Sequence, residues 1–178
     1  GPQTAPKALR VNGYEANDMI FEHPKKVYRE YLAKSEISTN SEALLRVWNF
    51  RNITGTKANT PEGRAQIVSR EREVLQHINH QNRDLYNHCL RSLTSFQKDE
   101  VTAEYSEVYE VPPGHVRFNE FIGKYGKNFS DMDRLNVVKL LIAKFSDLHE
   151  MKIAHRDVAD HSLWISPSKE VALSNFIS

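Results

Sequence analysis

The chain has 178 residues, of which 39% are hydrophobic and 26% are charged, so it can bury a core and lacks the composition of a disordered protein. Its net charge of +1 argues against a nucleic-acid binder that depends on bulk charge. A single cysteine, Cys89, excludes an internal disulfide framework and a thiolate zinc site. No apolar run approaches the ~18 residues that cross a bilayer and no signal-peptide pattern opens the chain, so we expect a cytoplasmic protein.

The first fifty residues predict one antiparallel hairpin. Residues 1–19 are weakly patterned, and we interpret them as an N-terminal extension with at most one short strand. Two β-prone runs follow within residues 26–50, and the polar segment 35–40 between them has the composition of a turn. The second of these runs is apolar except for one cation, Arg46.

A helix is predicted from Thr60 to about Ile78. Threonine is a good N-cap residue, and Pro61 suits the first helical position. Glu71 falls on the apolar stripe of this helix, which is formed by Ile67, Val74, Leu75 and Ile78. Because an unpaired carboxylate is costly to bury, we expect Glu71 to have a partner.

The second half of the chain is predicted to change from extended to helical structure. Residues 91–111 have an extended pattern, and a Pro-Pro-Gly sequence at 112–114 marks a boundary. Ser130 and Asp133 then form an approximate capping box for a helix that ends near Met151. The apolar face expected for this helix comprises Leu135, Val138, Leu141, Ile142, Phe145 and Leu148. Short extended pieces are expected at 153–158, 163–165 and 171–176, so the fold class is α+β.

The segment from Leu148 to Val158 carries a resemblance to a known family. Its sequence, LHEMKIAHRDV, resembles the end of the long C-lobe helix and the catalytic loop of protein kinases, whose pattern is L-H-x-x-x-I-x-H-R-D-L. The resemblance covers residues 20–178 and stops where the family has its magnesium-binding motif. It implies a protein-kinase-like two-lobe fold, with an N-terminal extension over 1–19, an N-lobe over 20–111 and a partial C-lobe over 112–178.

The resemblance also implies roles for single residues. Asp157 takes the place of the catalytic base, Arg46 that of the strand-three lysine, and Glu71 that of the helix-C glutamate. ATP and Mg²⁺ are the implied cofactors, and a Ser/Thr protein kinase is the implied class of enzyme. The gatekeeper and hinge positions, which contact the nucleotide in the family, hold Tyr109, Glu110 and Val111.

The phosphate-binding apparatus departs from the family pattern. There is no glycine between residues 13 and 55, so the loop expected to cover the phosphates offers Lys25 or Lys26 in place of closely approaching backbone N–H groups. Arg46 can still pair with Glu71, but its guanidinium is bulkier than a lysine ammonium and is not an equivalent phosphate ligand.

The metal-binding positions depart from it as well. The family's catalytic-loop asparagine is Ser162 here, and the aspartate of its D-F-G motif is Asn175. Because Mg²⁺ prefers anionic oxygen ligands, both replacements weaken metal binding. A neighbouring carboxylate, Asp160, is an alternative metal ligand. The histidines at 77, 80 and 88 are interpreted as solvated side chains rather than as a metal site.

Two functions follow from these observations. The leading hypothesis is a divergent protein-kinase-like domain related to ATP-dependent phosphotransferases, inactive or impaired in its chemistry. The alternative is a pseudokinase that works as an interaction or regulatory module and binds a protein partner, with or without nucleotide. The run from His155 to Trp164 also resembles kinase domains of bacterial phage-defence proteins of the phage growth limitation type, which are often joined to a nuclease-related domain. Completion of the C-lobe by another chain or by a dimer mate is a third interpretation.

Overall fold

The fold is described from a computed structural model that covers residues 9–11, 13–37, 42–55, 59–93, 97–99, 104–153 and 162–174. The chain divides into two compact units. The first consists of residues 1–68 and 91–111, and the second of residues 69–90 and 112–178. Both β-strands and α-helices are present, as the α+β class predicts.

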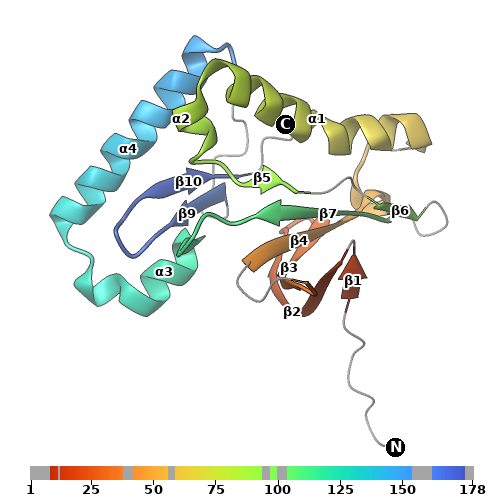
Figure 1. Cartoon of the computed structure of the whole chain (residues 1–178), viewed down its shortest axis with the longest axis horizontal. Coiled ribbons are helices and arrows are strands. Elements are labelled where there is room, and N and C mark those ends of the chain that lie inside the picture. The colour runs from red at the N-terminus through yellow and green to blue at the C-terminus, as the bar shows by residue number, and fades with distance from the viewer. Residues whose placement is uncertain are drawn as a thin grey trace, which may run out of the picture. The chain divides into compact units, whose positions relative to one another are not determined.

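The first unit is built on a curled antiparallel sheet (Figure 1). Its strands follow the order β1-β2-β3-β4-β7-β5, and β6 pairs with another stretch of β7. A short 3-10 helix, Phe50–Asn52, follows β4. The strands are β1 (Leu9–Val11), β2 (Tyr14–Glu22), β3 (Tyr28–Ser35), β4 (Glu42–Asn49), β5 (Arg91–Ser92), β6 (Gln97–Asp99) and β7 (Glu104–Glu110).

The predicted hairpin of residues 26–50 is confirmed as β3 and β4. The two strands pair antiparallel with Tyr31 opposite Leu45 and Ala33 opposite Ala43. Side chains alternate between the two faces of a strand, so one face of β4 collects small and branched apolar residues. This face forms an apolar core of Ala16, Ala33, Ala43, Leu45, Val47 and Val108.

The N-terminal segment differs from the expectation of an extension with at most one strand. Within residues 9–22 there are two strands, because β1 and β2 form a hairpin and β2 continues the sheet along β3. The register of β2 against β3 shifts twice between Ala16 and Phe21. Such irregularities interrupt the alternation of apolar and polar residues, which explains why the sequence pattern is weak there.

The predicted helix after Thr60 is confirmed as α1, Pro61–Gln81, and extends three residues beyond Ile78. The backbone N–H of Gly63 donates to the hydroxyl of Thr60 at 3.1 Å, as an N-cap requires. Glu71 is 2% exposed, so the prediction that it lies on the inward stripe is confirmed.

The second unit combines helices with a small antiparallel sheet of order β10-β9-β8. Figure 1 shows the β9–β10 hairpin beside the longest helix of this unit. Strands predicted at 163–165 and from 171 are confirmed, whereas most of 153–158 lies outside the described residues. The elements are α2 (Arg83–Tyr86), β8 (Val116–Arg117), α3 (Phe118–Tyr125), η3 (Gly126–Asn128), α4 (Asp131–Glu150), β9 (Leu163–Ile165) and β10 (Val171–Leu173).

The helix α4 begins where the sequence predicts, but the face that it buries differs from the predicted apolar face. Ser130 and Asp133 form a complete capping box, with each side chain accepting a hydrogen bond from the other residue's backbone N–H. Leu148 is buried as expected. Three residues of the expected inward face, however, are substantially exposed, and Val137 and Lys144 are buried in their place. The exposed residues are Leu135, Val138 and Ile142.

Two apolar clusters hold the second unit together. One joins the end of α1, α2, α4 and β10 through Leu75, Ile78, Leu85, Cys89, Leu148 and Leu173. Backbone hydrogen bonds from Leu90 to Leu173 and from Leu173 to His88 fix the segment after α2 to β10. The other cluster joins α3, the start of α4 and the small sheet through Phe121, Phe129, Val137, Ile165 and Val171. None of the helices in the described part of the chain is long and apolar enough to cross a membrane.

Candidate functional site

Arg46 lies at the centre of the sheet in the first unit. In the strand register it stands between two acidic residues, with Glu30 of β3 on one side and Glu107 of β7 on the other. The three side chains are at most 1% exposed. A buried charge is tolerated only when it is paired and hydrogen-bonded, so the contacts of Arg46 define this site.

The guanidinium of Arg46 forms an ion pair with Glu30. Its Nη2 atom lies 3.1 Å from Oε2 of Glu30, and its Nε atom donates to the same oxygen at 3.2 Å. Charge-assisted bonds of this kind are the strong ones in protein interiors. The pair joins β3 to β4 on the face opposite the apolar core.

Aromatic rings surround the same guanidinium. Its Cζ atom lies 4.6 Å from the ring centre of Tyr28, 4.6 Å from that of Tyr109 and 5.3 Å from that of Trp48. These distances are within the range of cation–π attraction, which strengthens when water is excluded. Arg46 therefore occupies an aromatic box that its own sheet provides.

A chain of hydrogen bonds extends from Arg46 to the second carboxylate. Nη1 of Arg46 donates to the hydroxyl of Tyr109 at 3.4 Å, and that hydroxyl donates to Oε2 of Glu107 at 2.9 Å. The hydroxyl of Ser92 donates to the other oxygen of Glu107. All three guanidinium nitrogens of Arg46 thus donate to side chains of one sheet, and the network spans β3, β4, β7 and β5.

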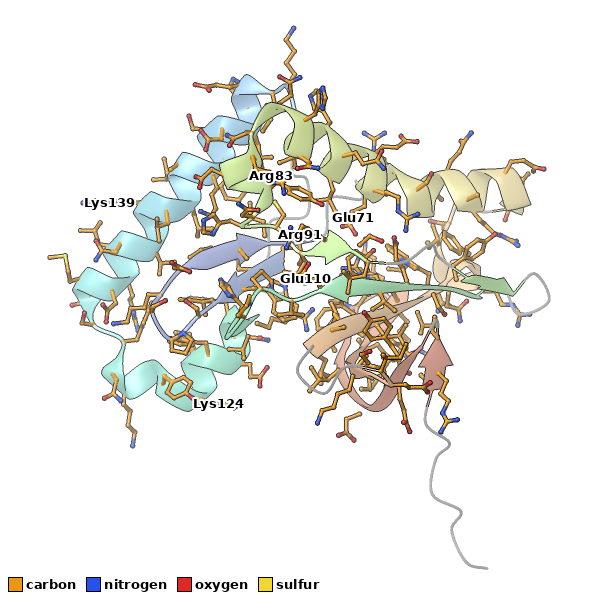
Figure 2. All side chains as sticks on the ribbon, viewed as in Figure 1. Glu71, Arg83, Arg91, Glu110, Lys124 and Lys139 are labelled. Carbon is orange, nitrogen blue, oxygen red and sulfur yellow. The ribbon has the colours of Figure 1, made fainter. Side chains whose placement is uncertain are left out.

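The structure brings Arg46 together with the predicted gatekeeper residue, Tyr109, through this network. Glu110 has a different partner, because its Oε2 atom lies 2.9 Å from Nη2 of Arg91 across the β5–β7 pairing (Figure 2). Both side chains of that pair are partly exposed. Val111 follows the end of β7 and is half-buried.

Lys25 lies in the tight turn that connects β2 to β3. The backbone N–H of Lys25 donates to Nδ1 of His23 at 3.1 Å, and the backbone N–H of Lys26 donates to the carbonyl of His23 at 2.7 Å. Lys26 has a φ of 57°, the left-handed region in which glycine is least strained. Both lysines are exposed, so the turn presents cations but no glycine.

Ser162 immediately precedes β9 in the second unit and is fully buried. Its carbonyl accepts a hydrogen bond from the backbone N–H of Ser174 at 3.0 Å, and the hydroxyl of Ser174 accepts from Nε1 of Trp164 at 3.0 Å. Asp157 and Asn175 lie outside the described residues. Glu71 belongs to the second unit and Arg46 to the first, so the expected pairing of these two stays a prediction.

Metal-binding groups do not cluster in the described part of the chain. No set of three or more histidine, cysteine, aspartate or glutamate side chains is placed there to hold an ion. His77 and His80 are exposed on α1, in agreement with the interpretation of these two as solvated side chains, and His88 is half-buried.

A buried lysine in the second unit has a shifted pKa and also shifts the pKa of a nearby histidine. Lys144 of α4 is 9% exposed and makes no hydrogen bond or ion pair within the described residues. Burial lowers the pKa of Lys144 from its ordinary value, although Cys89, Asp84, Asp147 and Glu170 act in the opposite direction. Burial and the charge of Lys144 also lower the pKa of His88.

We expect the Lys144→Met variant to be more stable than the wild type at neutral pH, by about 1 kcal/mol, because an apolar side chain removes the cost of burying the charge. Between the lowered pKa of Lys144 and its ordinary value of 10.5, the unfolded state binds more protons. Wild-type stability therefore rises with pH across that window, and the variant lacks this rise.

Urea unfolding at a series of pH values measures both effects. Lys139→Met on the same helix is the control, since Lys139 is exposed and its replacement should change neither the stability nor its pH dependence (Figure 2). A Lys144→Met variant that is less stable than the wild type at pH 7 would contradict the expectation.

Sequence reasoning did not identify Glu30 or Glu107 as members of the site. The signal was available in the alternation of the strands, because each carboxylate has at least one aromatic residue two positions away on its own face. Tyr28 precedes Glu30 by two residues, and Tyr105 and Tyr109 flank Glu107 in the same way. Charged residues at such positions in three strands indicate a buried polar network once the register is known. Neither a protein-family model nor a curated protein sequence matches this chain.

Proposed function

We propose that this chain is a protein-kinase-like domain that does not transfer phosphate and works as an interaction or regulatory module. The observation that carries the proposal is the state of Arg46, which stands at the position of the family's phosphate-binding lysine. All three of its guanidinium nitrogens donate to side chains of its own sheet, inside a box of aromatic rings. A phosphate ligand would have to break those contacts.

Two further features support a module rather than an enzyme. The turn at Lys25 has no glycine, so its backbone N–H groups are poorly suited to approach phosphates. Ser162, at a metal position of the family, is fully buried, and a neutral hydroxyl is a weak ligand for Mg²⁺. The resemblance to bacterial phage-defence kinases favours a regulatory role in such a system.

The proposal is tested by thermal unfolding and by transfer of labelled phosphate. We expect no transfer and no stabilisation by ATP that depends on Mg²⁺. A ligand that binds only the folded state would stabilise it by about 2.7 kcal/mol at a concentration one hundred times its Kd, so binding would be detected readily. Stabilisation by ATP alone would identify a nucleotide-binding module, and no shift would identify a module without nucleotide.

The catalytic loop provides the decisive control. Asp157→Ala removes the residue at the position of the catalytic base, and Asp160→Ala changes a carboxylate three residues away. Phosphate transfer by the wild type that Asp157→Ala abolishes would overturn the proposal in favour of a working kinase, and an additional loss in Asp160→Ala would assign that carboxylate to the metal.

A further inference from the structure

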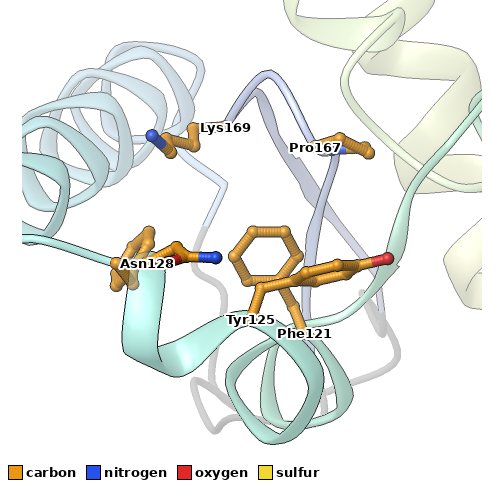
Figure 3. A pocket seen from close by; sticks show the side chains of 6 residues that line it. Phe121, Tyr125, Asn128, Pro167 and Lys169 are labelled. Atoms are coloured by element: carbon orange, nitrogen blue, oxygen red, sulfur yellow. The ribbon is translucent and has the colours of Figure 1, made fainter.

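A small pocket in the second unit lies between α3, η3 and the turn that joins β9 to β10 (Figure 3). Its volume is about 180 Å³, which suits one flat side chain and is too small for a nucleotide. Its lining residues are Phe121, Tyr125, Asn128, Phe129, Pro167 and Lys169.

Three aromatic rings form the apolar walls of this pocket. Phe121 and Phe129 are buried, with ring centres 5.8 Å apart and planes at 76°. Tyr125 is 48% exposed, and its ring lies 5.1 Å from that of Phe121 at 48°. An entering aromatic ring would therefore meet both faces and edges, the arrangements that aromatic pairs prefer. The exposure of Tyr125 places it at the mouth.

The opposite wall is held in place by hydrogen bonds within the β9–β10 turn and to α4. Ser166 organises the β9–β10 turn, since its carbonyl accepts from the N–H of Lys169 at 2.8 Å and its hydroxyl accepts from the N–H of Glu170 at 3.1 Å. Lys169 has a φ of 67°, and its Nζ atom donates to Oδ1 of Asp133 at 3.0 Å. A wall that is already ordered costs little entropy when a ligand binds.

The polar groups of the pocket favour an acidic ligand. The carboxylate of Asp133 accepts hydrogen bonds from Ser130 and Lys169, which lower its pKa, so its partners come from the protein itself. The ammonium of Lys169 uses one of its three protons on Asp133 and is partly exposed, so it can also pair with a carboxylate from outside. The amide of Asn128 is exposed, makes no hydrogen bond within the described residues and is directed into the pocket (Figure 3).

We propose that this pocket binds an aromatic side chain of a partner protein, presented on an extended segment with a carboxylate beside it. The ring lies against Phe121 and Tyr125, the carboxylate pairs with Lys169, and Asn128 hydrogen-bonds the segment's backbone. A cation at the rim favours an electron-rich ring over an aliphatic side chain or a proline. This inference rests on the proposed role as an interaction module and names the chemistry of its partner.

The probe is the acetylated and amidated tripeptide Glu-Phe-Glu, titrated into the full chain and followed by two-dimensional NMR. We expect saturable shifts at the backbone amides of α3, η3 and the β9–β10 turn, with a Kd on the order of 1 mM. The peptides Gln-Phe-Gln and Glu-Pro-Glu should bind roughly threefold to tenfold more weakly.

Variants locate the binding site. Tyr125→Ala should weaken the binding of Glu-Phe-Glu by roughly tenfold. Lys169→Gln should bind Glu-Phe-Glu and Gln-Phe-Gln with equal affinity, because the cation that pairs with the peptide's carboxylate is gone. The matched controls are Lys124→Gln, which changes a lysine of α3 outside the pocket, and Val138→Ala, which changes an exposed apolar residue of α4; neither should alter binding. Far-ultraviolet circular dichroism verifies that each variant is folded.

Three results would overturn the site: no shifts at peptide concentrations of several times about 1 mM, an affinity unchanged in both Tyr125→Ala and Lys169→Gln, or tighter binding of Glu-Pro-Glu. These measurements involve neither nucleotide nor phosphate transfer. If the peptide does not bind and no phosphate is transferred, only the proposed binding site is rejected. If phosphate is transferred, the proposed function is rejected whatever the peptide does.

Discussion

Replacement of Arg46 by methionine should lower the free energy of unfolding by about 3–5 kcal/mol, one of the two largest effects that we expect in this chain. The substitution leaves Glu30 and Glu107 buried without the cation between them. It also removes the guanidinium from contact with three aromatic rings. Arg46→Lys should restore only part of the loss, because an ammonium lacks the planar fork that bonds Glu30 and Tyr109 together. Urea unfolding followed by tryptophan fluorescence measures these changes, since Trp48 borders the site.

Two controls separate burial of charge from loss of a cation. Arg91→Met breaks a partly exposed ion pair with Glu110 in the same sheet and should cost about 1 kcal/mol or less. The double variant Glu30→Leu with Arg46→Met removes both charges and should be more stable than Arg46→Met alone. If the free energy of unfolding of Arg46→Met is within about 1 kcal/mol of the wild-type value, Arg46 does not stabilise the sheet as we expect. A ligand-binding role for Arg46 then becomes the better explanation.

The second large effect concerns the core of the second unit. Leu148→Ala should lower the free energy of unfolding by about 3–4 kcal/mol, since Leu148 is 1% exposed and packs with Leu75, Ile78, Leu85, Cys89 and Leu173. Removing its side-chain carbons loses their transfer free energy and leaves a cavity. Thermal unfolding should show a corresponding fall in Tm of several degrees, at roughly 2–4 °C per kcal/mol for a chain of this size.

Leu135→Ala on the same helix is the matched control. Leu135 is 46% exposed, so the same substitution should change the free energy of unfolding by about 0.5 kcal/mol or less. The sequence pattern places both leucines on one apolar face, and the structure separates them. Equal losses for the two variants would show that α4 buries a broader face than the structure describes.

Local signals explain the elements that were predicted correctly. A cap residue, a proline at the first position and an apolar spacing act within a few residues of one another, and they identified α1 and α4 near their observed bounds. The hairpin β3–β4 was predictable for the same reason. The strands β1 and β2 were missed because the irregular register between Ala16 and Phe21 removes the alternation on which strand prediction depends.

The sequence by itself determined that this chain is α+β, where its main helices begin, and that Arg46 and Glu71 interrupt apolar patterns. Only the tertiary structure decided what surrounds Arg46. Glu30 and Glu107 are 16 residues before it and 61 residues after it in the sequence, and strand register alone brings them to its sides. Likewise, the sequence periodicity predicts a wide apolar face on α4, but in the folded chain the buried residues of α4 are Val137, Lys144 and Leu148. Which part of a face is buried depends on the neighbours that reach it, and a local pattern carries no information about them.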